Sequence, residues 1–73
     1  MYFVYLYCND NKIAELNPAS NYLKVIMAQN NQICGIDLSK CSNVTIAAFN
    51  NNKLTRADLT NCIMLQSLWL NDN

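Results

Sequence analysis

Apolar residues recur along this chain in a fixed frame: apolar, two residues, apolar, one residue, apolar, two residues, asparagine. The last occurrence of the frame consists of Leu65, Leu68, Leu70 and Asn73. Three earlier occurrences have the same spacing, and they are Phe3-Leu6-Cys8-Asn11, Leu23-Ile26-Ala28-Asn31 and Val44-Ala47-Phe49-Asn52. Successive asparagines of the frame are 20, 21 and 21 residues apart. A constant period of this length is typical of a solenoid, in which each repeat forms one coil.

The centre of the frame predicts a short β-strand. Side chains alternate along a strand, so the two apolar residues point into the core and the residue between them points to solvent. We expect strands at residues 4–8, 25–28, 46–49 and 67–70. No segment has the 3.6-residue apolar period of a helix, so we expect no helix. The fold class is therefore a β-rich solenoid with a parallel front sheet of about four short strands.

The asparagine of the frame follows each strand, where the chain turns. Its amide both donates and accepts hydrogen bonds, so it can satisfy backbone groups that no strand partner reaches. Stacking of the coils predicts a structural ladder in which each amide bonds to the next, and its rungs are Asn11, Asn31, Asn52 and Asn73. Because Gly35 is the only glycine, left-handed backbone in the turns must come from Asn and Asp.

The second half of each repeat also recurs. Residues 33–39 match residues 54–60, and residues 13–17 match both more loosely. The segments around 36–38 and 57–59 alternate between apolar and polar residues, so we expect them to be extended and to form a second, shorter parallel ladder. The back of the solenoid is thus predicted to be irregular or to hold short strands.

The complete unit reads L-x-x-L-x-L-x-x-N-x-L-x-x-L-D-L-x-x-x-x-x, and it resembles the short, 21-residue class of bacterial leucine-rich repeats. Internalins are more distant relatives of that class. The resemblance implies a right-handed leucine-rich-repeat superhelix and a location outside the cell or on its surface, although no signal peptide is evident. The chain departs from the pattern at Pro18, where the first repeat is one residue short, and by alanine in place of leucine at Ala28, Ala47 and Ala57.

Residues 1–73 are expected to be a single leucine-rich-repeat segment of three coils and a half, without a capping segment at either end. A coil cannot bury its own apolar face, and an uncovered sheet edge leaves N–H and C=O groups unpaired. We therefore expect that the chain is not a stable free monomer. Either further repeats of a longer protein or another molecule should cover its ends.

Composition excludes several classes of function. Five acidic and five basic residues cancel, and no basic cluster points to nucleic acid. No apolar run has the length needed for membrane insertion. Histidine, the commonest general base and a frequent zinc ligand, does not occur in the chain. We expect no enzymatic activity, no cofactor and no metal site.

Two pairs of stacked side chains leave alternatives open. Cys41 and Cys62 occupy equivalent positions about 4.8 Å apart, which is within the range for a disulfide. Free cysteine suits a small inward position equally well, and we favour two buried thiols. Asp37 and Asp58 stack in the same way and could attract a cation. Because calcium takes six or more oxygens, we favour hydrogen bonds to nearby backbone or hydroxyl groups instead.

The outward residues of the front sheet form three rows across the strands. The first row is Tyr5, Val25, Ile46 and Ser67, the second is Tyr7, Met27, Ala48 and Trp69, and the third is Asn9, Gln29, Asn50 and Asn71. Repeat proteins bind partners on such extended surfaces, and exposed apolar area usually marks an interaction site. β-Propensity alone could also have selected these residue types. The candidate partner-binding residues are Tyr5, Tyr7, Val25, Met27, Ile46 and Trp69.

These observations favour a non-catalytic protein–protein interaction module that uses the front face of a leucine-rich-repeat solenoid. A protein partner or a second copy would bind through the apolar front face or through the uncapped ends. The alternative is a structural spacer segment of a larger bacterial surface protein, with no ligand of its own.

Overall fold

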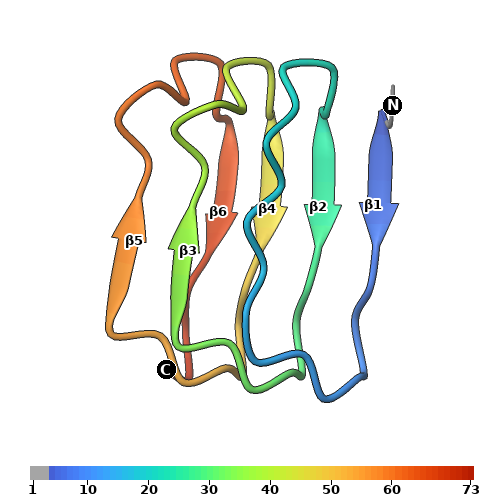
Figure 1. Cartoon of the computed structure of the whole chain (residues 1–73), viewed down its shortest axis with the longest axis vertical. Coiled ribbons are helices and arrows are strands. Elements are labelled where there is room, and N and C mark those ends of the chain that lie inside the picture. Colours follow the sequence, from blue (N-terminus) through green and yellow to red (C-terminus); the bar gives the residue numbers. More distant parts are fainter. Residues whose placement is uncertain (1–3) are drawn as a thin grey trace.

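The computed structural model describes residues 4–73, so Phe3, the first apolar position of the repeat frame, lies outside the described residues. The chain forms a β-solenoid of about three turns (Figure 1), and the described residues contain no helix. One side of the solenoid carries a four-stranded parallel sheet, and the opposite side carries a two-stranded parallel sheet. The predicted fold class is confirmed.

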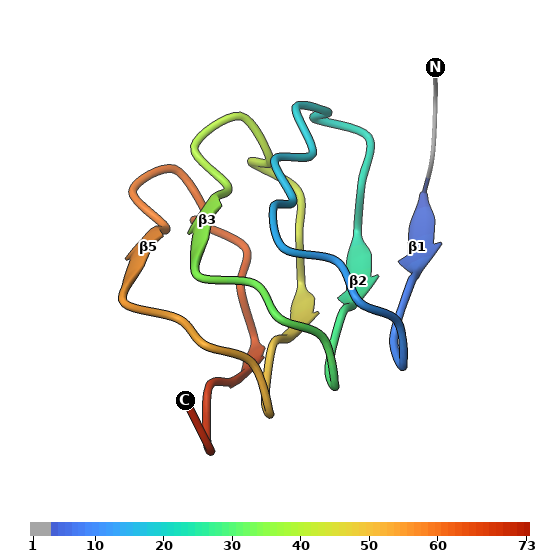
Figure 2. The same ribbon diagram turned by 60° about the horizontal axis from the view of Figure 1, so that its bottom comes forward.

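The front sheet has the strand order β1-β2-β4-β6. Its strands are β1 (Tyr5–Tyr7), β2 (Val25–Met27), β4 (Ile46–Ala48) and β6 (Ser67–Trp69). Each is shorter by one or two residues than the predicted range. The successive coils lie side by side in Figure 2, and β1 and β6 lie at opposite ends of the front sheet.

The back ladder consists of β3 (Gly35–Asp37) and β5 (Arg56–Asp58), which lie one residue earlier than predicted. In the first coil a single bridge between Leu16 and Ile36 takes the place of a third strand. Pro18 follows this bridge and has no N–H to continue a ladder. The back face is therefore a short-strand surface that is less regular than the front sheet.

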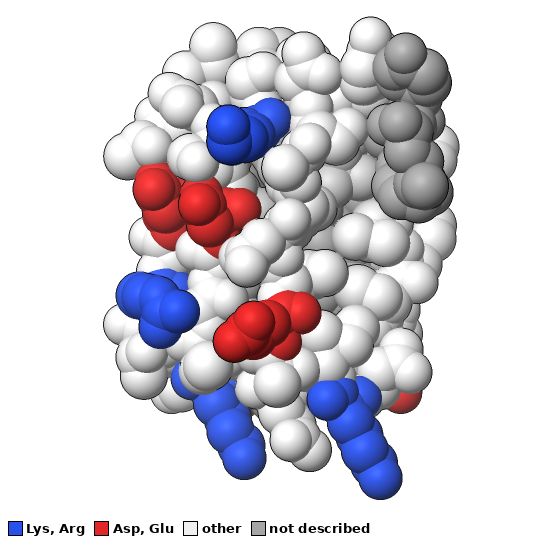
Figure 3. Space-filling model, in the orientation of Figure 1, with Lys and Arg blue, Asp and Glu red and all other residues white. Residues whose placement is uncertain are grey.

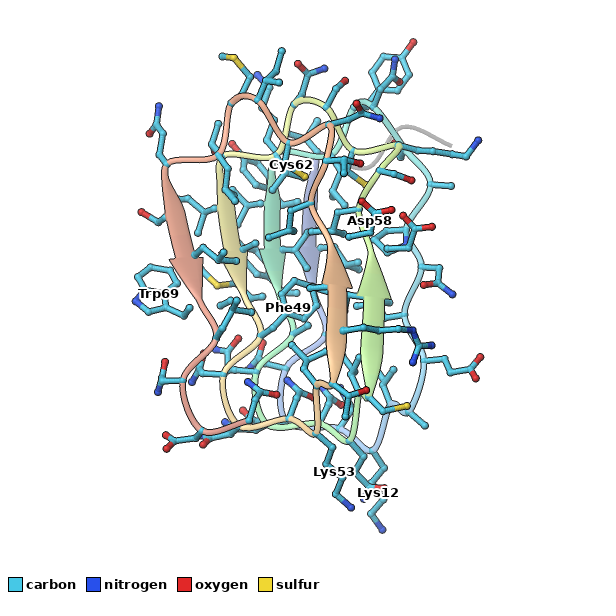
Figure 4. All side chains as sticks on the ribbon, turned by 90° about the vertical axis from the view of Figure 1, so that its left-hand side faces the viewer. Lys12, Phe49, Lys53, Asp58, Cys62 and Trp69 are labelled. Carbon is cyan, nitrogen blue, oxygen red and sulfur yellow. The ribbon has the colours of Figure 1, made fainter. Side chains whose placement is uncertain are left out.

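The core lies between the two sheets and is complete only in the middle coils. Phe49, Leu23 and Ile26 are fully buried, and Figure 4 shows Phe49 between the sheets. Burial of one such side chain is worth about 1.5–3 kcal/mol. The equivalent positions of the outer coils, including Leu6 and Leu68, are only partly buried. A coil buries its apolar residues fully only where it has a neighbour on both sides.

Left-handed backbone recurs once in every turn after a front strand. The residues that adopt it are Asp10, Asn30, Asn51 and Asp72, with φ of 60°, 61°, 56° and 59°. Asn and Asp tolerate this region better than other residues with a side chain. The prediction that Asn and Asp replace glycine in the turns is confirmed. Gly35 lies in β3, beside the Arg56 side chain.

The asparagines of the frame form the predicted ladder, but their hydrogen bonds go to backbone atoms. Asn52 Nδ2 donates to the carbonyl oxygens of Phe49 in its own coil and Ala28 in the preceding coil, both at 3.0 Å. Its Oδ1 accepts the N–H of Ile33, also at 3.0 Å. Asn31 makes the equivalent bonds one coil earlier. The prediction that each ladder amide bonds to the next amide is therefore wrong at Asn31 and Asn52. Their side chains bond to backbone groups instead, because the backbone of the preceding coil lies within reach.

The expected bonding between side chains occurs instead at the left-handed residues, which we call the outer ladder. Asn30 Nδ2 donates to Asp10 Oδ1 at 2.6 Å, and Asn51 Nδ2 donates to Asn30 Oδ1 at 2.9 Å. Asp72 occupies the next position, but its side-chain carboxylate has no N–H to donate to Asn51 Oδ1. The outer ladder therefore stops between the third and fourth turns.

Replacement of Asn52 by alanine should destabilise the fold by about 1–3 kcal/mol, because it leaves buried backbone groups unpaired. Asn11 is the matched control, since it is exposed and, among residues 4–73, its amide donates only to the carbonyl groups of Cys8 and Asn9 in its own coil. Urea unfolding followed by circular dichroism measures both variants. An Asn52→Ala curve that overlays that of the parent chain would show that the ladder carries no stability.

Replacement of Asp72 by asparagine should stabilise the last coil, because the new Nδ2 group could donate to Asn51 Oδ1. The expected gain is about 0.5–1 kcal/mol, the value of an ordinary hydrogen bond. Asp10→Asn is the control, since Asp10 already accepts the amide of Asn30. Hydrogen exchange of the backbone amides in residues 67–73 reports the change. Equal protection in Asp72→Asn and the parent chain would contradict the expectation.

Candidate functional site

The strand register brings the predicted rows together on the front face. In the first row, Tyr5 pairs with Val25, Val25 with Ile46, and Ile46 with Ser67. The second row is built in the same way from Tyr7, Met27, Ala48 and Trp69. All six candidate partner-binding residues therefore share one face of a single sheet.

Exposure is highest at the two edges of this face. Tyr5 and Tyr7 on β1 are 59% and 64% exposed, and Trp69 on β6 is 46% exposed. Figure 4 shows Trp69 projecting from β6 away from the core. Val25, Met27 and Ile46 are half-buried. The face thus carries aromatic side chains at both edges and aliphatic side chains between them.

Ala48 differs from the expectation that the whole second row faces solvent, because it is only 3% exposed. Its methyl group is short, and its register partners Met27 and Trp69 are both large. These neighbours shield it from water although it points outward. Ala48 is therefore the low point of the row.

The two tyrosine rings of β1 are held against each other. Their centroids lie 6.3 Å apart and their planes are parallel, an arrangement within the range of favourable aromatic pairs. Tyr5 and Tyr7 are separated by one residue on the strand, so both point to the same side. The pair therefore presents one aromatic edge of the front face to solvent.

The third row supplies amide groups along one border of the face. Asn9 Nδ2 donates to Asp10 Oδ2 at 2.9 Å, and Asn71 Nδ2 donates to Asp72 Oδ2 at 3.1 Å. Among the residues described, Gln29 Oε1 is the one buried side-chain oxygen or nitrogen without a hydrogen-bond partner. These amides offer hydrogen bonds beside the apolar rows.

No residue of the three rows is charged. Charged side chains instead lie over β3 and β5 and near the turns on the side of the molecule seen in Figure 3. Figure 4 places Asp58 on the back ladder and Lys12 and Lys53 at the turns. The front face is thus electrically neutral, whereas the back face carries both signs of charge.

The back-face carboxylates bond to neighbouring residues, as favoured from the sequence. Asp37 Oδ1 accepts the N–H of Ser39 at 2.9 Å, and Asp58 Oδ1 accepts the hydroxyl of Thr60 at 2.7 Å. The Ser39 hydroxyl, then the Ser39 N–H and nearby Lys40 hold the pKa of Asp37 below its usual value. Residues 4–73 contain no group of three or more His, Cys, Asp or Glu side chains placed to hold a metal ion.

The cysteines are free thiols. Cys41 is buried, and its Sγ donates to the carbonyl oxygen of Pro18 at 2.7 Å. Cys62 Sγ points to the carbonyl oxygen of Leu38 at 3.5 Å. Burial, with a smaller effect of Cys41 and Asp58, raises the pKa of the Cys62 thiol, and burial also raises the pKa of Cys8. Cys8 and Cys62 are therefore less readily ionised than ordinary thiols. Cys41 is a buried thiol, as favoured from the sequence, whereas Cys62 is a free thiol that is only half-buried.

Comparisons of the chain with known protein families, with curated proteins and with solved structures find no match. In residues 4–73 no helix has the length and apolar character needed to cross a membrane.

Replacement of Ser39 by alanine should raise the pKa of Asp37 toward its usual value, because the hydroxyl that stabilises the carboxylate is lost. A carboxylate whose pKa is lower in the folded chain than in the unfolded chain stabilises the fold at pH values above the unfolded pKa. This stabilisation is lost as the pH falls through the folded pKa. Carboxyl chemical shifts measured by NMR during an acid titration report the value. Ser67→Ala on the front face should leave the pKa of Asp37 unchanged, and an equal shift in both variants would contradict the assignment.

Proposed function

We propose that this chain is a non-catalytic binding module of the bacterial leucine-rich-repeat type, which presents its front face to a protein partner at the cell surface. The observation that carries the proposal is the continuous neutral face on four paired strands, with Tyr5, Tyr7 and Trp69 exposed at its edges. The repeats of 20 or 21 residues and the bonding of Asn31 and Asn52 support the leucine-rich-repeat assignment.

The chemistry of the front face suits a protein partner. Tyr, Trp and Met are enriched at the centres of protein interfaces, and charged residues are depleted there. Truncation of aromatic anchors usually costs more binding energy than truncation of other residues, so Tyr7 and Trp69 are the proposed anchors. The amides of the third row supply the polar rim. The exposed Ile63 and Met64 lie outside the three rows, in the turn before β6.

A structural spacer is the second candidate. Val25, Met27 and Ile46 are half-buried by their neighbours, and β-branched and aromatic residues fit a pleated surface whether or not it binds anything. This interpretation accounts for the centre of the face. It gives no reason for three aromatic side chains that are 46–64% exposed.

The double substitution Tyr7→Ser and Met27→Ser tests the proposal. It should reduce capture of protein partners by the immobilised chain about tenfold or more, because it removes one anchor and its neighbour. Quantitative mass spectrometry of the captured proteins measures the effect, and circular dichroism shows whether the fold is kept.

The matched control is Tyr22→Ser with Met64→Ser, which removes the same residue types from outside the three rows. Both control positions are about as exposed as the edges of the front face, at 52% and 51%. Equal capture by the parent chain and the front-face variant would favour the spacer. Loss of capture in the control variant alone would place the contact outside the front face.

A further inference from the structure

We propose that the protein partner of the front face is a second copy of this chain, packed face to face with its solenoid axis reversed. The inference rests on the proposed function, because it names the partner of the same surface. In this arrangement a two-fold axis runs parallel to the strands, between β2 and β4. It places β1 opposite β6 of the second copy and β2 opposite β4 of the second copy.

A two-fold axis requires the face to be complementary to itself. This axis reverses the strand order β1-β2-β4-β6 in the second copy. Each row of one copy still lies opposite the equivalent row of the other copy. Tyr7 therefore meets Trp69 of the second copy, and Met27 meets Ala48. Strands of facing sheets stay nearly aligned, as in ordinary sheet-on-sheet packing.

The sizes of the side chains match under this reversal. In the second row the long Met27 side chain lies opposite Ala48, the low point of the row at 3% exposure. In the first row the exposed Tyr5 lies opposite the small Ser67. Tyr5 and Met27 thus each meet a small side chain, whereas Val25 meets Ile46 and the aromatic anchors Tyr7 and Trp69 meet each other. Offset or edge-to-face contacts between such rings are favourable.

The third row is complementary to itself for a chemical reason. Asn9 lies opposite Asn71 of the second copy, and Gln29 lies opposite Asn50. An amide carries both a donor and an acceptor, so two facing amides can pair in either orientation. No residue of the three rows is charged, so the rows themselves bring no like charges together.

The other in-plane two-fold axis, along the solenoid, fits less well. It would place β1 on β1 of the second copy and would reverse the order of the rows. Tyr5, Val25 and Ile46 would then face amides of the third row. Apolar groups would cover polar groups that need partners, which costs free energy.

The area of the face limits how tightly two copies can associate. Four strands spaced about 4.8 Å apart and three rows about 7 Å apart give a face of about 400 Å² per copy. Both copies together would bury about 800 Å², which is less than the roughly 1,000 Å² that stable specific interfaces exceed. The proposed dimer is therefore weak and reversible, and its formation depends on the protein concentration.

Charge substitutions at positions 7 and 69 test the alignment. The variant Tyr7→Glu with Trp69→Lys places a carboxylate opposite an ammonium group of the second copy. The variant Tyr7→Glu with Trp69→Glu differs only in the sign of one charge and places two carboxylates opposite each other. Within one copy the two positions are three strand spacings apart, about 14 Å, so salt largely screens their interaction.

Sedimentation equilibrium of the full chain from about 10 µM to about 1 mM measures the dimer dissociation constant. The parent chain should show a reversible monomer–dimer equilibrium. Tyr7→Glu alone should weaken it about tenfold or more, and the Glu/Lys variant should dimerise about tenfold more tightly than the Glu/Glu variant. Melting curves show that each variant folds. If the variants at position 69 fail to fold, Tyr5→Glu with Ser67→Lys or Ser67→Glu gives the same comparison in the first row.

Three results would overturn the inference, and they are distinguishable from failure of the proposed function. A parent chain that is monomeric throughout the concentration range removes the second copy as partner, while binding of a different protein remains possible. Equal dissociation constants for the Glu/Lys and Glu/Glu variants show that positions 7 and 69 do not face each other. An association that Ile63→Ser with Met64→Ser abolishes and Tyr7→Glu leaves unchanged places the contact at the last turn.

Discussion

The side-chain amide of one asparagine per coil is the interaction on which this fold depends. After each front strand the chain turns away, and some of its backbone groups no longer have a partner in a neighbouring strand. Asn31 and Asn52 replace those partners from within the turn, since each amide joins carbonyl groups of two successive coils and accepts an N–H at the start of the back half. The amide therefore links the stacking of the coils to the satisfaction of buried polar groups.

Because the asparagines satisfy the backbone of the turns, the outward residues of the front sheet are free to vary. The inward apolar positions and the asparagines hold each coil in register with the next, so any side chain compatible with a strand can occupy the outward rows. The register then aligns those side chains every coil, as it aligns Tyr7, Met27 and Ala48. The outward rows therefore determine the chemistry of the front face, whereas the core and the asparagines determine the fold. The proposed function accordingly rests on the rows and not on the core.

Periodicity predicts the strands, their register, the back ladder and the rows, because these features follow from equal spacing along the chain. It did not predict which atoms the amides of Asn31 and Asn52 contact, since that depends on distances between turns of different coils. It also missed the outer ladder, although each frame asparagine is preceded by Asn or Asp, as in Asn30-Asn31. The burial of Ala48 depends on the length of neighbouring side chains, which a two-residue alternation does not contain.

The distribution of burial connects stability to binding. The core is dense around Phe49 in the middle coils and thin at β1 and β6, where Leu6 and Leu68 have a neighbouring coil on one side only. The three exposed aromatic residues of the front face, Tyr5, Tyr7 and Trp69, project from these same outer strands. A partner that contacts both of these outer strands must span all four strands of the front sheet. Because a ligand stabilises only the state that it binds, occupation of the front face would compensate for the incomplete burial at both ends of the solenoid.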